Sequence, residues 1–436
     1  MSTPSAESEI RVPSNPEADA AFLADFTTMS AFGATAAGGV ERQAATDEDI
    51  ANRRWLAEWL IDRGFTVAYD RVGNMFGLYE FAPGRPYVLA GSHMDSQPRG
   101  GKYDGAYGVL AAAHSLDRLR RYYDTHPEAV VNNIAVVNWF NEEGSRFKPS
   151  MQGSGVFTGK ISLTVALETE DSAGVTVFEA LSAANMLGEH DVFDSGEHVN
   201  DDDLLPIASY AEMHIEQGRE LDKAGMIMGI VDSTWGANKY ELSVLGHQAH
   251  TGATAIADRQ DALYGAAQVV VGLRELADSY GDDLHTSCGQ LTVIPNSPVV
   301  VAREVEMHMD LRSPDDAILE EADAKLNRLF AEIEVRADVK IEKRFAHTWK
   351  GHTYTPEGVS LSTKVIEDLG VSHMHVRTRA GHDSTNMKDI VPTVMLFIPS
   401  VDGVSHAENE FTHDDDMIVG VDVLTETLAR MVEGAL

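Results

Sequence analysis

The sequence predicts an α/β protein in which a domain with a mostly parallel sheet is interrupted by a smaller α+β domain. Two buried-strand patterns, Tyr87–Ala90 and Asn133–Phe140, each run into a polar loop, and the first loop leads into the helix-like run Ala106–Tyr123. This order places side chains at the carboxyl edge of a parallel sheet, where open α/β sheets bind ligands. This pattern of buried strands, polar loops and helices changes near Val231 and returns after about a hundred residues, and a segment of that length has the size of one inserted domain.

Residue periodicity predicts the elements of the larger domain in turn. Apolar residues at helical spacing indicate amphipathic helices, and alternation or short apolar runs indicate strands. The expected helices are 47–63, 106–123, 358–369 and 415–433, and the expected strands are 65–69, 75–79, 87–90, 133–140, 210–215 and 393–398. Residues 1–18, which are rich in Ser, Pro and Glu, are expected to form a loose tail.

The inserted segment has strands and helices in an order that predicts a small ferredoxin-like α+β sandwich. Its expected strands are 239–245, 299–311 and 335–345, and its expected helices are 258–280 and 314–333. The predicted domains are therefore 19–231 with 348–436 for the larger one and 232–347 for the inserted one.

Composition narrows the classes of partner. The net charge of -35 argues against nucleic acid and anionic membranes, which both need a basic face. The acidic residues are scattered, which fits an ordinary acidic surface or a host with high internal salt. No apolar run approaches a membrane span, and no basic-then-apolar leader opens the chain. The single cysteine, Cys288, excludes an intrachain disulfide, so we expect a cytoplasmic protein.

The loop after the strand 87–90 offers one imidazole and two carboxylates, from His93, Asp95 and Asp104. Divalent metals prefer these ligand types. In an extended segment the Asp95 side chain can reach the far ring nitrogen of His93 and leave the other nitrogen for a metal. A single His-x-Asp is common in proteins, so this interpretation depends on further residues.

Adjacent carboxylates at the end of a buried strand, Glu142 and Glu143, are the second signal. Like charges repel there, and a nearby cation removes the penalty. One side chain can bind metal while its neighbour moves protons, although a solvated loop is the alternative. His214 and His406 also lie at predicted strand-to-loop exits. Because all these residues are placed in one domain at such exits, a shared metal site is a better explanation than coincidence.

Several motifs follow one another in an order typical of one enzyme family. They are Gly91–Pro98 with Tyr103–Gly105, Trp139–Phe147, His214–Gly218, Ala249–Gly252, Asp310–Arg312, Gly381–Ser384 and Gly403–His406. With these motifs the chain resembles the metal-dependent amidohydrolases of the peptidase-M20-like superfamily. Within it, the chain is similar to the carbamoylase branch of N-carbamoyl-L-amino-acid hydrolases, β-ureidopropionase and allantoate amidohydrolase.

The resemblance implies two divalent metal ions per subunit, bridged by Asp104. One ion would be held by His93 and His214, and the other by Glu143 and His406. Zn²⁺ is the first expectation, and Mn²⁺, Co²⁺ or Ni²⁺ also suit these ligands. Peptidases of the superfamily usually have a carboxylate where this chain has His214, which favours the carbamoylase branch.

The resemblance also implies roles in catalysis and substrate binding. Glu142 would be the general base and later the acid, with Asp95 and His250 as further catalytic residues. Gln217, His250 and Arg312 match substrate-binding positions, and Arg312 would bind a substrate carboxylate in a bidentate manner. The inserted domain would be a lid and dimerisation domain, which implies a homodimer.

Two departures from the family bear on the substrate. The family usually has an asparagine at the position of Val299, within the segment that begins at Asn296, and it tends to have glycine where this chain has Arg379. We include Asn296 and Arg379 as candidate substrate contacts, although an exposed ion pair is the alternative for Arg379.

The function that follows is hydrolysis of a linear C–N amide bond in a small ureido or amide substrate that carries a carboxylate. An N-carbamoyl amino acid, cleaved to free amine, CO₂ and ammonia, is the first expectation. The alternatives are an allantoate amidohydrolase and an aminoacylase or M20-type peptidase. A non-catalytic binding protein is disfavoured, because all five expected ligands and Glu142 are present.

Overall fold

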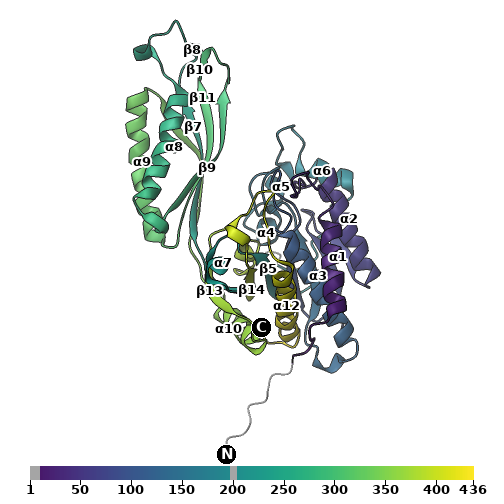
Figure 1. The fold of residues 1–436 in the computed structure, drawn as a ribbon. Coiled ribbons are helices and arrows are strands. Elements are labelled where there is room, and N and C mark those ends of the chain that lie inside the picture. Colours follow the sequence, from purple (N-terminus) through teal and green to yellow (C-terminus); the bar gives the residue numbers. More distant parts are fainter. Residues whose placement is uncertain (1–9, 197–203) are drawn as a thin grey trace, which may run out of the picture. The chain divides into compact units, whose positions relative to one another are not determined.

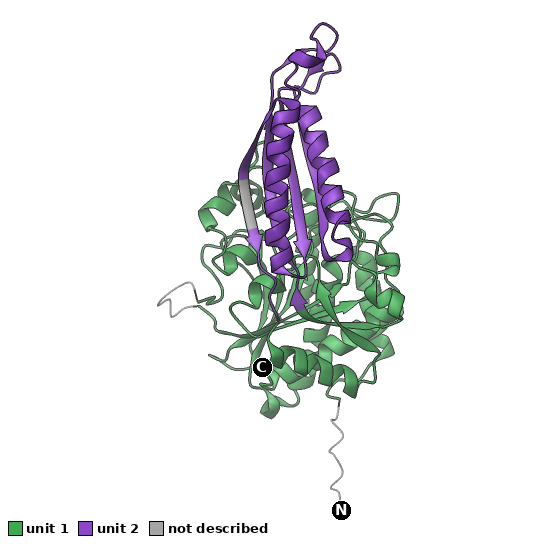
Figure 2. Ribbon diagram, turned by 90° about the vertical axis from the view of Figure 1, so that its left-hand side faces the viewer, with its two compact units in different colours: residues 1–232, 354–436 green, residues 233–353 purple. Residues whose placement is uncertain are grey.

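The computed structural model describes residues 10–196 and 204–436. The chain divides into two compact units, Met1–Asp232 with Tyr354–Leu436 (unit 1) and Ser233–Thr353 (unit 2), which Figure 2 colours separately. The first nine residues of the expected tail and the acidic run Asp201–Asp203 lie outside the described residues.

Unit 1 is built on an eight-stranded mixed sheet with the order β1-β2-β4-β3-β5-β14-β6-β13. Its strands are β1 Thr66–Tyr69, β2 Met75–Tyr79, β3 Tyr87–His93, β4 Asn133–Trp139, β5 Ile207–Ile215, β6 Met228–Thr234, β13 His373–Thr378 and β14 Thr393–Ile398. The four central strands, β4, β3, β5 and β14, are parallel. The neighbouring pairs β1–β2, β2–β4 and β14–β6 are antiparallel, so the expected mostly parallel sheet is confined to the centre.

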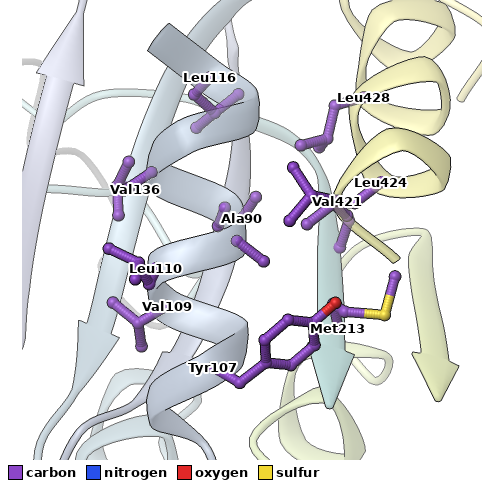
Figure 3. Close-up of a cluster of buried hydrophobic side chains, with 14 of the residues drawn as sticks. Ala90, Tyr107, Val109, Leu110, Leu116, Val136, Met213, Val421, Leu424 and Leu428 are labelled. Atoms are coloured by element: carbon purple, nitrogen blue, oxygen red, sulfur yellow. The ribbon is translucent and has the colours of Figure 1, made fainter. Parts of the chain in front are cut away.

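Helices cover this sheet. They are α1 Pro16–Met29, α2 Asp47–Asp62, α3 Ala106–Tyr123, α4 Gln152–Phe157, α5 Leu163–Glu168, α6 Val177–Ala184, α7 Glu220–Ala224, α10 Pro356–Asp368, α11 Ser384–Met387 and α12 Asp414–Val432. Figure 3 shows apolar side chains of α3, such as Leu110, and of α12, such as Leu424, in one cluster with those of the central strands, such as Ala90 and Val136. Burial of these side chains fixes α3, and with it the loop that precedes it.

The first helix differs from the sequence-based expectation, which placed a loose tail up to residue 18. Helix α1 already begins at Pro16, because Asn15 caps it by accepting the backbone N–H of Glu17 and proline suits the first turn. Just before this helix, the side chain of Arg11 pairs with Glu426 of α12 at 3.0 Å and with Glu433, the residue after α12, at 2.8 Å. The start of the described chain is therefore fastened to its last helix.

Unit 2 is a four-stranded antiparallel sheet with the order β12-β7-β11-β9, and Figures 1 and 2 show helices α8 and α9 on one face of it. Its elements are β7 Gly236–Leu245, β8 Ala249–His250, α8 Ala262–Asp278, β9 His285–Ile294, β10 Val300–Val301, β11 Glu304–Ser313, α9 Asp316–Ala337 and β12 Lys340–Trp349. Alternating residues of β7 and β11 pack against the two helices in a core of its own.

Two expected elements of unit 2 are corrected. The strand expected at 299–311 is broken at Ala302–Arg303, between β10 and β11. The strand expected at 335–345 begins only at Lys340, because α9 continues to Ala337 and ends at Asp338 in the left-handed conformation. In the part of the chain that the structure describes, no helix has the length and apolar character needed to cross a membrane.

Candidate metal centre

The expected metal ligands gather at one edge of the sheet of unit 1. β3 ends at His93, β5 carries His214 near its end, and Glu143 follows the end of β4. His406 lies in the loop that follows β14. These are the carboxyl ends of the four parallel strands, which meet at the same edge, and Asp104 lies in the loop between β3 and α3.

One group of potential ligands consists of His93, Asp104 and His214, all buried. Nε2 of His214 lies 3.1 Å from Oδ1 of Asp104, and Nε2 of His93 lies 3.6 Å from the same oxygen. One atom from each residue lies within 4.8 Å of the others, which is close enough to share an ion.

The second group, Asp104, Glu143 and His406, uses the other side of the same aspartate. Nε2 of His406 lies 3.1 Å from Oδ2 of Asp104 and 3.6 Å from Oε2 of Glu143. The two groups therefore share Asp104, which offers one carboxylate oxygen to each. The His406 side chain is half exposed, so this group is the more open of the two.

Both buried histidines have the tautomer that metal binding needs. Nδ1 of His93 lies 3.0 Å from the peptide oxygen of Asp95, and Nδ1 of His214 lies 2.8 Å from that of Ile215. A carbonyl can only accept, so each Nδ1 carries a proton, and each Nε2 faces Asp104, where it can offer a lone pair to a cation. The backbone N–H of Gly105 donates to Nε2 of His214 at 3.0 Å, which agrees with this assignment. The donor set therefore fits divalent cations such as Zn²⁺.

Glycine is required at position 105, between Asp104, which the two groups share, and α3. Gly105 has a φ of 61°, and a Cβ atom there would lie 2.3 Å from Nε2 of His93. Any side chain would therefore push into the imidazole that faces Asp104. The Asp104–Gly105 pair in the loop motif thus places a ligand and keeps its neighbourhood open.

Charge is concentrated in this centre. Burial opposes ionisation of Asp104, yet the imidazoles of His214, His406 and His93 hold its pKa well below the usual value. Burial and the charge of Asp104 raise the pKa of Glu143 to about 7. The carboxylates also overcome burial at His406 and raise its pKa to about 9. Protons and a divalent cation compete for these same atoms, so binding of a cation would release protons.

Asp95 links the loop of His93 to the two glutamates after β4. Its carboxylate accepts the backbone N–H groups of Glu142 and Glu143, each at 3.2 Å. Its peptide oxygen bonds to His93, whose Nδ1 lies 3.6 Å from the Asp95 carboxylate. The contact expected through the Asp95 carboxylate is thus made chiefly through the Asp95 backbone, and the carboxylate serves the glutamates instead.

Glu142, the expected base, is buried beside the first group of ligands. Its Oε2 atom lies 3.6 Å from Nε2 of His93. Burial raises the pKa of Glu142 well above its usual value, and the charges of Asp383 and Glu143 act in the same direction against the influence of His93. A carboxyl group with a raised pKa can accept and return a proton near neutral pH.

Two residues that hold the ligands were missed as functional positions. Gln97 donates two hydrogen bonds to the carboxylate of Glu143, from its backbone N–H at 3.1 Å and from its side-chain amide at 2.7 Å. Glu410 accepts the backbone N–H of Asp104 at 3.1 Å and the hydroxyl of Ser405 at 2.8 Å. Both follow a ligand by four residues in sequence, after His93 and His406, which is the only signal that the sequence offers.

The substrate-binding candidates of unit 1 have different surroundings. The side-chain amide of Gln217 donates to Oδ2 of Asp104 at 2.8 Å, so this residue belongs to the centre itself. Arg379 instead forms an ion pair with Glu220 at 2.6 Å, and both side chains are substantially exposed. This pairing favours the surface role that was the alternative for Arg379.

The remaining candidates lie in unit 2. Nδ1 of His250 accepts the backbone N–H groups of Gly252 and Ala253 at 3.0 and 3.2 Å. The ring therefore carries its proton on Nε2, in an exposed side chain. Asn296 is also exposed and has a φ of 53°. Arg312 pairs with Asp310 at 2.8 Å.

Comparison with known proteins places this chain in one family. The family model of peptidase family M20/M25/M40 matches residues 89–430. The sequence is 59% identical to a protein of Mycolicibacterium smegmatis that is named only as a hydrolase, over the whole of this chain and 98% of that protein. It is 32% identical to an N-carbamoyl-L-amino-acid amidohydrolase of Rhizobium meliloti, over 93% of this chain and 94% of that protein.

Two further similarities point the same way. An allantoate amidohydrolase of Bacillus subtilis is 31% identical over 92% of this chain and 95% of its own length. The crystal structure of an amidase of the hydantoinase/carbamoylase family from Burkholderia vietnamiensis has a TM-score of 0.88 and 31% identity, over 98% of this chain and 99% of that one. The fold and its relatives define a hydrolase that acts on carbon–nitrogen bonds in linear amides. The chain belongs to peptidase family M20/M25/M40.

Proposed function

We propose that the protein is a dimetal amidohydrolase that cleaves an N-carbamoyl amino acid to the free amino acid, CO₂ and ammonia. The observation that carries the proposal is the pair of ligand groups that share Asp104, with the buried carboxyl group of Glu142 beside them. Relatives named N-carbamoyl-L-amino-acid amidohydrolase support the substrate class. Allantoate is the second candidate, because a relative of similar identity is named for it.

The ions would be held by His93 and His214 on one side of Asp104 and by Glu143 and His406 on the other. Divalent ions in such a site supply Lewis acidity, which lowers the pKa of water and polarises a carbonyl group. Zn²⁺ is the first choice, and Mn²⁺, Co²⁺ or Ni²⁺ remain compatible with histidine and carboxylate ligands.

Glu142 performs the proton transfers of the proposed reaction. It removes a proton from the attacking water and later gives that proton to the amino nitrogen, as the bond between this nitrogen and the ureido carbon breaks. The carbamic acid that is released decomposes to CO₂ and ammonia. Asp95 orients Glu142 through the backbone bond described above.

His250 and Arg312 serve substrate binding in this proposal. The Nε2–H of His250 is a hydrogen-bond donor fixed by two backbone groups, and it donates to the oxygen on which negative charge develops. Arg312 binds the substrate carboxylate with its planar guanidinium, and Gln217 and Asn296 offer amide groups to the ureido atoms. Unit 2 thereby acts as a lid.

A homodimer is part of the proposal, because one copy of unit 2 cannot bring both residues to one substrate. Arg312 lies near one end of β11, opposite Ala237 of β7. At the other end of β11, Glu304 lies opposite Leu245, the last residue of β7, and His250 follows five residues later in the chain. The rise from Glu304 to Arg312 alone is about 27 Å, at about 3.4 Å per residue. A second copy that supplies one of the two residues resolves this separation.

The surface that we propose for this dimer is edge strand β9 with the outer face of α8. β9 forms one edge of the four-stranded sheet, and antiparallel pairing with a second β9 would continue that sheet. Apolar side chains are exposed on both elements, namely Leu263, Tyr264, Val270, Val271 and Leu291. Light scattering of Val271→Asp in comparison with the unchanged protein tests this surface, and an unchanged mass would exclude it.

A screen for released ammonia tests the function. N-carbamoyl amino acids, 3-ureidopropionate, allantoate and N-acetyl amino acids are offered to the metal-loaded protein, with Glu142→Gln as the blank. We expect the highest kcat/KM for an N-carbamoyl amino acid. Highest activity on allantoate would select the second candidate, and no turnover of any compound by protein with bound metal would reject both. With Cys288 as the single cysteine, we keep the cytoplasm as the proposed location.

A further inference from the structure

A buried arginine from outside the matched family region contacts residues 94–100, the start of the loop between β3 and α3. We call these residues the metal loop. Arg42 is 1% exposed and precedes the family match, which begins at residue 89. Its Nε donates to the peptide oxygen of Met94 at 2.9 Å, and its Nη1 donates to those of Met29 and Phe32 at 3.0 and 3.3 Å. Burial lowers the pKa of Arg42 to about 10, which leaves the guanidinium charged at neutral pH.

The backbone of Arg42 holds the same loop a second time. Its N–H donates to the hydroxyl of Ser96 at 3.1 Å, and its carbonyl accepts the N–H of Ser96 at 3.1 Å. Two residues away, Val40 and Gly100 exchange two backbone hydrogen bonds at 3.0 and 2.9 Å. Residues 39–42, which we name the brace, therefore run antiparallel along residues 96–100.

The residue between these attachment points is Asp95. Arg42 fixes the peptide oxygen before it, at Met94, and the backbone after it, at Ser96. Asp95 in turn holds the ring of His93 with its peptide oxygen and the N–H groups of the two glutamates with its carboxylate. The guanidinium also lies near enough to the Asp95 carboxylate for the two charges to favour each other.

We propose that Arg42 is a positioning residue for the metal centre, which fixes Asp95 and thereby the imidazole of His93 and the backbone of the two glutamates. The inference deepens the function proposed above and rests on its metal centre. The guanidinium suits this role because its planar fork reaches three carbonyl groups at once, which an ammonium group cannot reproduce. Loss of such support around metal ligands typically weakens metal binding 10- to 100-fold.

The test measures cobalt binding by the metal-free full-length protein. Co²⁺ is titrated in while its visible absorption, which depends on ligand geometry, is recorded, and a competing chelator gives the Kd. We expect Arg42→Lys to bind Co²⁺ about tenfold more weakly or worse, with an altered absorption spectrum. Arg430→Lys is the matched control, since Arg430 is also buried but bonds to Glu426 and Asp368.

A second variant disturbs the brace and leaves Arg42 itself unchanged. A Cβ atom at Gly39 would lie 2.2 Å from the peptide oxygen of Gly100, so Gly39→Ala separates the brace from the loop. We expect the same direction of change in Kd and spectrum. The inference is overturned if both variants bind Co²⁺ like the unchanged protein, or if Arg430→Lys weakens binding as much as Arg42→Lys. Failure of the unchanged protein to bind Co²⁺ would instead overturn the metal centre and this inference with it.

Discussion

The two units hold their candidate functional residues in opposite ways. In unit 1 the ligands lie at the ends of the central parallel strands, and His214 is only 1% exposed. In unit 2 the side chains of His250, in the short strand β8, and Asn296, between β9 and β10, are exposed. A buried donor set can fix the geometry of a cation, whereas exposed side chains on a separate unit can respond to substrate. Substitutions in unit 1 should therefore change chemistry and metal content, and those in unit 2 should change substrate binding.

The largest effect is expected for Glu142→Gln. Turnover should fall about 10²–10⁴-fold, the usual contribution of general acid–base catalysis. Bound metal should not change, because Glu142 belongs to neither ligand group. Elemental analysis and kcat are measured on the same preparation, with the exposed Glu80→Gln as the control. Normal metal content together with near-normal kcat would remove Glu142 from the catalytic step.

His406→Ala should remove one of the two proposed ions. The variant keeps His93, Asp104 and His214 but lacks the imidazole of the more open group. We expect metal content to fall from about two ions per chain to about one, with at least a tenfold loss of activity. Elemental analysis after dialysis checks this outcome, and a variant that retains both ions would exclude His406 as a ligand of the second group.

Arg312→Lys tests the unit 2 side of the comparison. An ammonium group cannot reproduce a bidentate bond to a carboxylate, so KM should rise about tenfold while kcat and metal content stay near normal. Steady-state kinetics with saturating metal provide the measurement. A fall in kcat at unchanged KM would mean that this residue of unit 2 acts on the chemical step instead.

Arg379→Gly should have little effect, although the residue departs from the family pattern. The side chain is paired with Glu220 at the surface, and such exposed pairs contribute about 0–1 kcal/mol to stability. The ratio of kcat/KM for two substrates should change less than about threefold, and Tm should fall slightly. A clear shift in substrate preference would return Arg379 to the list of substrate contacts.

The smallest effect concerns pH and a buried histidine of α3. Burial keeps the pKa of His114 below its usual value despite the 3.0 Å contact with Asp25, and the charges of Arg118 and Arg63 lower it further. The unfolded chain takes up a proton near pH 6.5, whereas the folded chain does so only at lower pH. The free energy of unfolding should therefore fall as the pH drops through about 6.5. His114→Gln should show a flatter dependence of Tm on pH between 5 and 7 than the unchanged protein; an equal slope would assign the effect to other groups.

The sequence predicts the central elements well because their burial leaves a strong pattern. The bounds expected for α3 and β14 agree with the structure, since α3 is apolar toward the sheet and β14 is buried along its length. Strands β9 and β13 were missed, because edge strands bury few side chains and lack this signal. The end of α9 was misjudged because Val335, a residue typical of strands, is 86% exposed on the helix.

For the candidate site, sequence reasoning named the residues that come together at the sheet edge and, of those that hold them, Asp95 but not Gln97, Glu410 or Arg42. His93, Asp104 and His214 stand out because each follows or ends a buried strand. Arg42 carries no such signal, since it acts through backbone carbonyls that any residue provides. Contacts of this kind depend on tertiary structure, and their recognition needs the fold.

The position of β14 has a consequence for the order in which the protein can fold during synthesis. This strand lies between β5 and β6 in the sheet of unit 1, yet it begins at Thr393, near the end of the chain. Unit 2 is continuous and has its own core, so it can fold as it leaves the ribosome. The sheet of unit 1 lacks β14, one of its central strands, until synthesis of the chain is almost complete. Until then β5 exposes an unpaired edge, which is the stage at which the nascent chain most needs protection from aggregation.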